Sequence, residues 1–261
     1  MKRTDYTSLK HLVTAVPVPA QTATYKPVSN AQLIDLTLAA IDGAGFTLGK
    51  EAYTLAADGQ VSTGKFTLTN IMDSEMQIQI GWQNSYNRQV SLKFAIGVNI
   101  MICSNGLVSG DMGTFKKAHK GSIQEFTPSA ITEYIKSAGD AFREMQVQRE
   151  MMKRVDLTRR QQGELLGRMV YEEDIISTMQ LNIIRKELIR PSYDYGVENT
   201  LWDLYQHTTH SMKELHPATW MNDHMSAHSF FVNAQGELIT KKTTATISAP
   251  QLAYQQLELS L

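Results

Sequence analysis

The sequence predicts an α+β fold, in which an antiparallel β-meander of about five strands packs against an N-terminal helix and a helical C-terminal half. Over much of residues 46–103, apolar and polar residues alternate with the period of two that is typical of half-buried strands. From residue 128 onwards, apolar residues recur at helical spacing instead. Hydrophobic residues make up 42% of the 261 positions, which is enough to form a core.

The composition divides the chain into three segments. Residues 1–28 predict an extended Pro-rich arm, which either straps onto a neighbouring subunit or lies irregularly on its own domain. Residues 29–236 predict a single α+β domain, with its sheet in 46–108 and its helices in 127–232. Residues 240–261 are rich in Thr, Ala and Gln and predict a weakly ordered or partner-dependent tail.

The N-terminal helix of the domain is expected to begin at Ser29 or Asn30, both of which are capping residues, and to end at Gly43. The Asp-Gly pair at 58–59 lies between two β-rich runs and predicts a hairpin. The Asn-Gly pair at 105–106 is expected to reverse the chain, with positive φ, after a buried central strand. The strands are expected at 46–55, 61–70, 76–82, 90–96 and 98–103.

Capping residues delimit the helical half. One long helix is expected from Pro128 to at least Met145, because its apolar stripe continues without a break. Pro217 is expected to open the last helix and Gly236 to end it. The helices between them are expected to start at the capping boxes Thr158 with Gln161 and Ser177 with Gln180, and at Asn199 or Thr200.

The charge and the cysteine content exclude several classes of protein. There are 25 Lys and Arg residues against 26 Asp and Glu residues, so the net charge of -1 gives no overall attraction to nucleic acid or anionic membranes. The single cysteine, Cys103, excludes an internal disulfide and fits a reducing cytosol. A thiol in an apolar strand is inert, so we predict no catalytic pair with His119. No apolar run spans a bilayer, and we expect a cytoplasmic protein with no membrane partner.

A local basic patch follows the sheet in a Gly-rich loop. Basic side chains neutralise phosphates and an aromatic ring stacks on a base, so the patch predicts a nucleic-acid site, with an ordinary solvated loop as the alternative. The loop lacks phosphate-loop and dinucleotide fingerprints, so we expect no cofactor. A second basic group in 149–160 is interpreted as a charged helix surface. The predicted nucleic-acid-binding residues are Phe115, Lys116, Lys117, His119 and Lys120, with Arg88 from the neighbouring turn.

Five of the seven histidines lie between His207 and His228. His207 and His210 are three residues apart, and His224 and His228 are four apart, so each pair would share one helix face, as a metal requires. The glutamate that a zinc protease carries beside its first histidine is absent. Polar helix surface or internal hydrogen bonding is the alternative, and we predict no metal site.

Three motifs carry a family resemblance. The chain has Cys-Ser-Asn-Gly at 103–106, an Asn-Ser-Tyr turn at 84–86 and Asn-Thr-Leu-Trp-Asp-Leu-Tyr at 199–205. In these features it resembles the phage and plasmid proteins grouped as domain of unknown function family 932, over roughly residues 30–232. Because no activity is assigned to that family, the resemblance implies an origin in a mobile element rather than a mechanism.

These observations favour a non-enzymatic phage or plasmid protein that binds single-stranded DNA and promotes annealing or recombination. The order of helix, β-meander and further helices is similar to that of ring-forming single-strand annealing proteins of phages. The alternative is a counter-defence or host-takeover protein that acts by protein contact. A metal-dependent hydrolase that uses the histidine pairs ranks last. The arm, the tail and open sheet edges also predict a homo-oligomer, with internal closure of those edges as the alternative.

Overall fold

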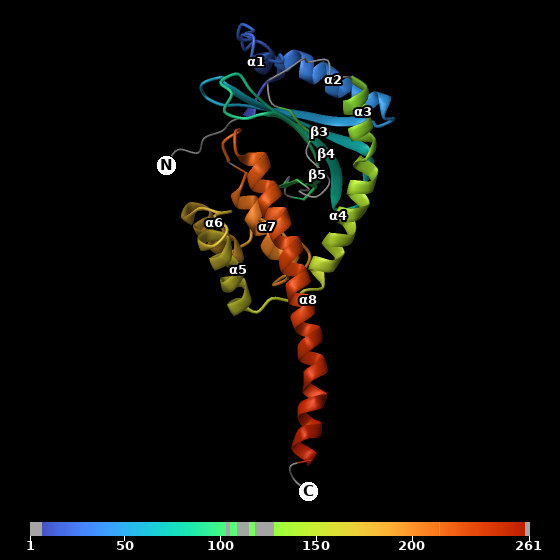
Figure 1. The fold of residues 1–261 in the computed structure, drawn as a ribbon, viewed down its shortest axis with the longest axis vertical. Helices are drawn as coiled ribbons and strands as arrows, with labels where there is room; N and C mark the ends of the chain where they lie inside the picture. Colours follow the sequence, from blue (N-terminus) through green and yellow to red (C-terminus); the bar gives the residue numbers. More distant parts are fainter. Residues whose placement is uncertain (1–6, 103–104, 109–114, 118–127, 214, 259–261) are drawn as a thin grey trace.

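The computed structural model describes residues 7–102, 105–108, 115–117, 128–213 and 215–258 of the chain. An antiparallel sheet lies between helices, which confirms the predicted α+β fold with an N-terminal helix and a helical C-terminal half (Figure 1). None of the described helices is both long enough and apolar enough to cross a membrane.

The sheet is a meander, because the strands β1 to β6 follow one another in space in the order of the sequence. The short strands β6 and β7 both pair with β5, β6 with its C-terminal half and β7 with its N-terminal end. The four long strands are β2 (Leu48–Leu55), β3 (Val61–Met72), β4 (Met76–Ser85) and β5 (Leu92–Ile100), and the short ones are β1 (Thr7–Ser8), β6 (Asn105–Val108) and β7 (Phe115–Lys117).

The hairpin predicted at 58–59 is confirmed, and two other predictions about the sheet were wrong. Gly59 has a φ of 70° in the turn that joins β2 to β3. Val98 does not begin a separate central strand, because the pairing of β5 with β4 runs through Gly97 without a register shift. Asn105 and Gly106 do not form the chain reversal, since they already lie in β6, opposite Ile100 and Asn99.

One face of the sheet is apolar and fully buried. Because side chains alternate across a strand, every second residue of the long strands points to this face. The helix α2 (Asn30–Gly43) lies across it, and α3 (Pro128–Lys136) and α4 (Ala138–Lys153) run down beside it (Figure 1). The strand residues in this core are Tyr53, Phe66, Leu68, Met76, Ile78, Ile80, Trp82, Leu92, Phe94, Ile96, Val98 and Ile100.

The opposite face is polar, yet it is covered as well. It carries Lys65, Gln83 and Lys93, which alternate with the apolar residues of β3, β4 and β5. The last helix, α8 (Trp220–Glu258), begins beneath this face (Figure 1). Trp220 packs directly on Gly81, where an added Cβ would lie 3.2 Å from the indole ring. A glycine at this point of β4 therefore lets the helix approach the sheet.

Tyr134 of α3 fills a gap in the edge of β5. On that edge, β7 pairs as far as Phe94 and β6 pairs from Gly97 onwards. The Tyr134 hydroxyl accepts a hydrogen bond from Ile96 N at 3.1 Å and lies 3.5 Å from Phe94 O. A side chain from the helical layer thus satisfies the backbone groups between the two short strands.

The predicted helix caps are largely confirmed. Ser29 caps α2, Thr200 caps α7, and the two predicted capping boxes precede α5 and α6. The long helix expected from Pro128 is instead two helices, because the Ser137 hydroxyl donates to Tyr134 O at 2.7 Å and competes with the helical backbone bonds. The remaining helices are α1 (Lys10–Thr14), α5 (Arg159–Tyr171), α6 (Thr178–Ile189) and α7 (Leu201–Ser211).

The N-terminal arm packs on its own domain, which is the second of the two arrangements expected for it. β1 pairs with β2, and Val13 of α1 is 0% exposed in the core. Asn30 ties the arm to the sheet, since its Nδ2 donates to Val13 O at 3.1 Å and its Oδ1 accepts from Ser62 and Asn84. Tyr53 and Thr54 of the β2 edge are therefore paired from within the chain.

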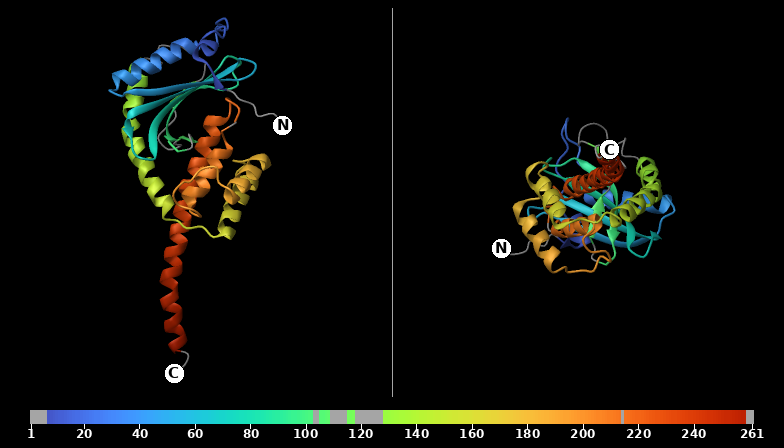
Figure 2. Two further views of the ribbon diagram at one scale, coloured as in Figure 1. Left: turned by 180° about the vertical axis from the view of Figure 1, so that it is seen from behind. Right: turned by 90° about the horizontal axis from the view of Figure 1, so that it is seen from below.

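The last helix is much longer than the sequence suggested. α8 begins at Trp220, three residues after Pro217, and does not end at Gly236 but runs to Glu258. A glycine inside a helix costs only about 1 kcal/mol, and the helical hydrogen bonds continue past it. Beyond Leu238, which packs on the core, α8 projects away from the domain (Figure 2). The expected tail is thus helical up to Glu258.

A substitution at Gly64 tests the packing of the apolar face. A Cβ at Gly64 would lie 2.5 Å from Nε1 and Cε2 of the buried Trp82 indole. We therefore expect Gly64→Ala to lower the free energy of unfolding by about 1–3 kcal/mol through overpacking, measured by urea denaturation. Gly163→Ala is the control, because nothing lies within 4 Å of that helical position, and it should stabilise by about 0.5–1 kcal/mol. Equal stability of Gly64→Ala and wild type would contradict this packing.

Candidate functional site

Two lysines lie on the polar face of the sheet, on either side of β4. Lys65 Nζ is 4.3 Å from the centre of the Trp220 ring, at a distance suited to a cation–π interaction. Lys93 Nζ donates to Asn222 Oδ1 at 2.5 Å. Both ammonium groups therefore lie under the first turn of α8 and make this layer electropositive.

Burial changes the protonation equilibria of this layer. It lowers the pKa of Lys65 to about 8. Burial, and secondarily the charge of Lys65, lowers the pKa of His224 to about 3. His224 is consequently neutral at physiological pH, whereas Lys65 is still mostly protonated, so the positive charge of this layer comes from the lysines and not from the histidine.

The same layer contains buried polar atoms that lack a hydrogen-bond partner among the described residues. The four atoms are Thr63 Oγ1, Gln83 Oε1, Trp220 Nε1 and His224 Nδ1. Buried polar groups are nearly always satisfied in native proteins. The layer between the sheet and α8 thus has unused donors and acceptors beside its two lysines.

The structure brings the turn at Arg88 and the strand β7 to the same end of the sheet. Lys117 is opposite Leu92, only four residues after Arg88, and Lys116 is at the register position of Lys93. Arg88 is exposed, has a φ of 63°, and its guanidinium carbon lies 4.3 Å from the centre of the Tyr25 ring. The structure thus brings four of the six predicted nucleic-acid-binding residues to one end of the sheet, namely Arg88, Phe115, Lys116 and Lys117. The other two, His119 and Lys120, lie outside the described residues, as does Cys103.

The second basic group includes a buried anchor for α4. Arg149 is 8% exposed and its Nη1 lies 2.8 Å from Asp73 Oδ2. Lys153 Nζ lies 2.6 Å from Glu75 Oε1. Burial alone would raise the pKa of Asp73, but hydrogen bonds from Gln146, the backbone and Arg149 lower it. These two cations hold α4 to the β3–β4 turn.

The histidine pairs do not converge on a metal site. His228 Nδ1 lies 3.0 Å from the Tyr205 hydroxyl, and His224 packs edge-on against Trp220. His207 and His210 face Glu187 instead. No group of three or more His, Cys, Asp or Glu residues suited to a metal occurs in the part of the chain that the structure describes.

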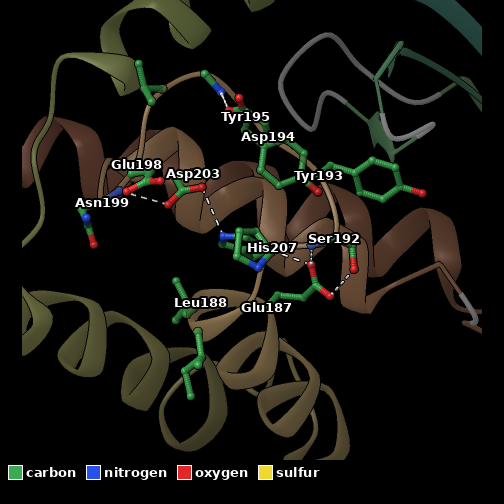
Figure 3. A pocket seen from close by; sticks show the side chains of 14 residues that line it. Glu187, Leu188, Ser192, Tyr193, Asp194, Tyr195, Glu198, Asn199, Asp203 and His207 are labelled. Atoms are coloured by element: carbon green, nitrogen blue, oxygen red, sulfur yellow. Dashed lines mark hydrogen bonds and ion pairs between the residues drawn. The ribbon is translucent and has the colours of Figure 1, made fainter.

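A pocket of about 440 Å³ lies between the end of α6, the following loop and α7 (Figure 3). His207 Nε2 lies 3.1 Å from Asp203 Oδ1, and Glu187 accepts hydrogen bonds from Ser192 N and Oγ at 2.9 and 2.7 Å. The sequence analysis identified His207 only as one of a pair of helical histidines. The sequence could have shown that Asp203 is the acidic partner of His207, because the two residues are four apart on one helix face.

The sequence analysis also missed Lys65, Lys93 and Trp220. The period of two places Lys65 and Lys93 on the face opposite Phe66 and Phe94, so a sequence signal for the two lysines existed. The approach of Trp220 depends on how α8 docks, which no local pattern reports.

Comparison with known proteins gives one match. The family model described as "Domain of unknown function (DUF932)" matches residues 19–242. No curated protein and no solved structure matches the chain.

Acid titration tests the placement of His224. Its pKa is about 3 in the folded state against 6.5 in the unfolded state, so only the unfolded state takes up a proton as the pH falls from 6.5. The stability that neutral His224 contributes above pH 6.5 is therefore lost towards pH 3. Relative to His224→Leu, wild type should lose roughly 2 kcal/mol of unfolding free energy between pH 7 and 5, measured by urea denaturation. Parallel pH profiles of the two proteins would place His224 in contact with water.

Proposed function

The chain belongs to the DUF932 family, and we propose that it is a non-enzymatic mobile-element protein that binds single-stranded DNA and promotes annealing or recombination. The observation that carries this proposal is the pairing of β7 with β5, which brings a Phe-Lys-Lys strand to the end of the sheet that carries Arg88. Phage or plasmid origin, and with it a bacterial host, rests on the family resemblance, and the proposed cytoplasmic location rests on the single cysteine and on the lack of a long apolar run.

The register of β7 supports phosphate binding. Lys116 is opposite Lys93, so two lysines occupy facing positions of adjacent strands. Like charges at such positions repel unless a counter-charge lies near them. The phosphates of a nucleic acid would supply that counter-charge at β7, because Lys65 and Lys93 themselves lie under α8.

Arg88 supports contact with an unpaired strand. Its guanidinium is held over the Tyr25 ring, and the Tyr25 hydroxyl donates to Tyr86 O at 3.0 Å. An exposed cation held by an aromatic ring is pre-organised for a phosphate, and Phe115 belongs to the strand at the same end of the sheet. Base stacking with a backbone contact of this kind is tolerant of sequence.

The salt dependence of binding tests this proposal. For a single strand, log K falls with log salt with a slope of about −0.7 per neutralised phosphate. The triple variant Arg88→Gln, Lys116→Gln, Lys117→Gln should bind a single-stranded oligonucleotide more weakly, with a slope shallower by about 2 (3 × 0.7), measured by fluorescence anisotropy.

The matched control removes three exposed arginines from other elements, by Arg143→Gln, Arg159→Gln and Arg160→Gln. It has the same net charge as the test variant, and we expect it to bind like wild type. Equal losses in both variants, or no binding by wild type at low salt, would refute the proposed interface.

We also propose that the protein forms a homo-oligomer through the projecting part of α8. Helices in proteins are stabilised mainly by packing of an apolar face, and Pro250 inside this helix costs about 3 kcal/mol. A contact with a second copy of the chain would offset this cost. The arm is not part of this proposal, because β1 pairs with β2 and Val13 lies in the core of its own domain.

Light scattering coupled to size exclusion tests the oligomer. The full chain should elute above its monomer mass of 29.3 kDa, and deletion of residues 240–261 should reduce the assembly. Deletion of 1–28 should destabilise the fold instead, since Val13 and Tyr25 are buried. A monomeric full chain at tens of micromolar would contradict this proposal.

The projecting helix also favours a second candidate function, a counter-defence or host-takeover protein that acts by protein contact. A helix that leaves its domain is available to a partner as well as to a second copy. Retention of one stoichiometric host protein after nuclease treatment of a lysate, lost on deletion of 240–261, would favour this function over DNA binding.

A further inference from the structure

The pocket between α6 and α7 has a strongly acidic lining. Four carboxylates line it, and no lysine or arginine is among its lining residues. These carboxylates come from the end of α6, from the connecting loop and from the first turn of α7, as Figure 3 shows. The four residues are Glu187, Asp194, Glu198 and Asp203.

Three of these carboxylates are fixed by hydrogen bonds from the protein. Glu187 accepts from Ser192, Asp194 accepts from Gly196 N at 2.8 Å, and Asp203 accepts from Asn199 N at 3.0 Å. Burial alone would raise the pKa of Glu187, but Ser192, followed by His210 and His207, lowers it below its ordinary value. The floor of the pocket therefore keeps its negative charge at neutral pH.

His207 supplies an independent observation. It is 2% exposed, and its Nε2 lies 3.1 Å from Asp203. Its Nδ1 has no hydrogen-bond partner among the described residues and lies 3.9 Å from Glu187 Oε2, beyond hydrogen-bond range. When Nε2 carries the proton, Nδ1 is an acceptor beside a carboxylate. Two acceptors at this separation are suited to a donor from outside the chain.

Two tyrosines complete the walls of the pocket. Tyr195 packs edge-on against His207, with ring centres 5.4 Å apart. The ring centre of Tyr193 lies 6.4 Å from that of Tyr195. Lys213 Nζ lies 4.9 Å from the centre of the Tyr193 ring, so one protein cation already contacts this aromatic wall. Aromatic faces with carboxylates are the groups that recognise organic cations.

We propose that this pocket binds an organic cation with N–H donors, either an amine or a guanidine. The donors bridge Glu187 and Asp203 with His207 Nδ1, while the tyrosines contact the apolar part of the ligand. The volume of about 440 Å³ is in the range of small-molecule sites. The site uses other elements than the sheet face proposed for DNA, so the two proposals can fail separately.

Isothermal titration of the full chain at low ionic strength tests the ligand class. The probes are Nα-acetyl-arginine N-methylamide, which represents a protein side chain, and spermidine, a free polyamine. Saturable binding of at least one supports the proposal, and the preferred probe identifies the source of the cation. The uncharged citrulline analogue should bind at least about tenfold more weakly, because it lacks the charge-assisted hydrogen bonds. No saturable binding at millimolar concentration, or equal binding of the citrulline analogue, would overturn it.

Variants test the location of the site. Asp203→Asn should weaken binding of the preferred probe by about tenfold. Glu198→Gln, at an exposed position, should weaken it by about threefold, and it carries the test if Asp203→Asn fails to fold. Glu144→Gln removes an exposed carboxylate from α4 and should leave binding unchanged. Wild-type affinity in both pocket variants would exclude this pocket.

Discussion

The fold depends on a single constraint: both faces of one sheet are buried, although only one of them is apolar. The alternation in β3, β4 and β5 divides the side chains between Phe66, Trp82 and Phe94 on one face and Lys65, Gln83 and Lys93 on the other. The apolar face is stabilised by helices that exclude water from it. The polar face loses hydration when α8 covers it, so that helix must supply polar contacts in return, such as Asn222 to Lys93.

The charge distribution follows from how these layers are used. Basic residues gather at the Arg88 end of the sheet, whereas carboxylates line the pocket beside α6 and α7. The net charge of -1 is the near-cancellation of these regions and others. The absence of an overall charge therefore says little about partners, because recognition acts over the Debye length of about 10 Å and not over the whole molecule.

The parts of the fold that follow from local rules were predicted from the sequence. The caps at Ser29 and Thr200 and the turn at Gly59 each depend on a few adjacent residues. The prediction that Gly236 ends a helix failed because a glycine is only mildly unfavourable inside one.

For the candidate sites, the sequence showed some of the residues but not which of them come together in space. The basic residues of β7 were visible as a cluster, but their pairing with β5 depends on long-range register. The pocket combines Glu187 with Asp203 and His207 from another helix, and no spacing in the sequence connects them. Such sites follow from tertiary packing, which single-sequence periodicity does not encode.

The Tyr134 hydroxyl has a consequence for how the sheet opens. Because it occupies the backbone between the two short strands, β6 and β7 share no hydrogen-bonded position along β5. Release of β7 breaks its own three-residue ladder and leaves that of β6 intact. We therefore expect the edge of the sheet to open in two separate units, β6 and β7, each at a smaller free energy than the four long strands. The β5 amides that pair with β7 would then exchange at one rate and those that pair with β6 at another, instead of all β5 amides exchanging together.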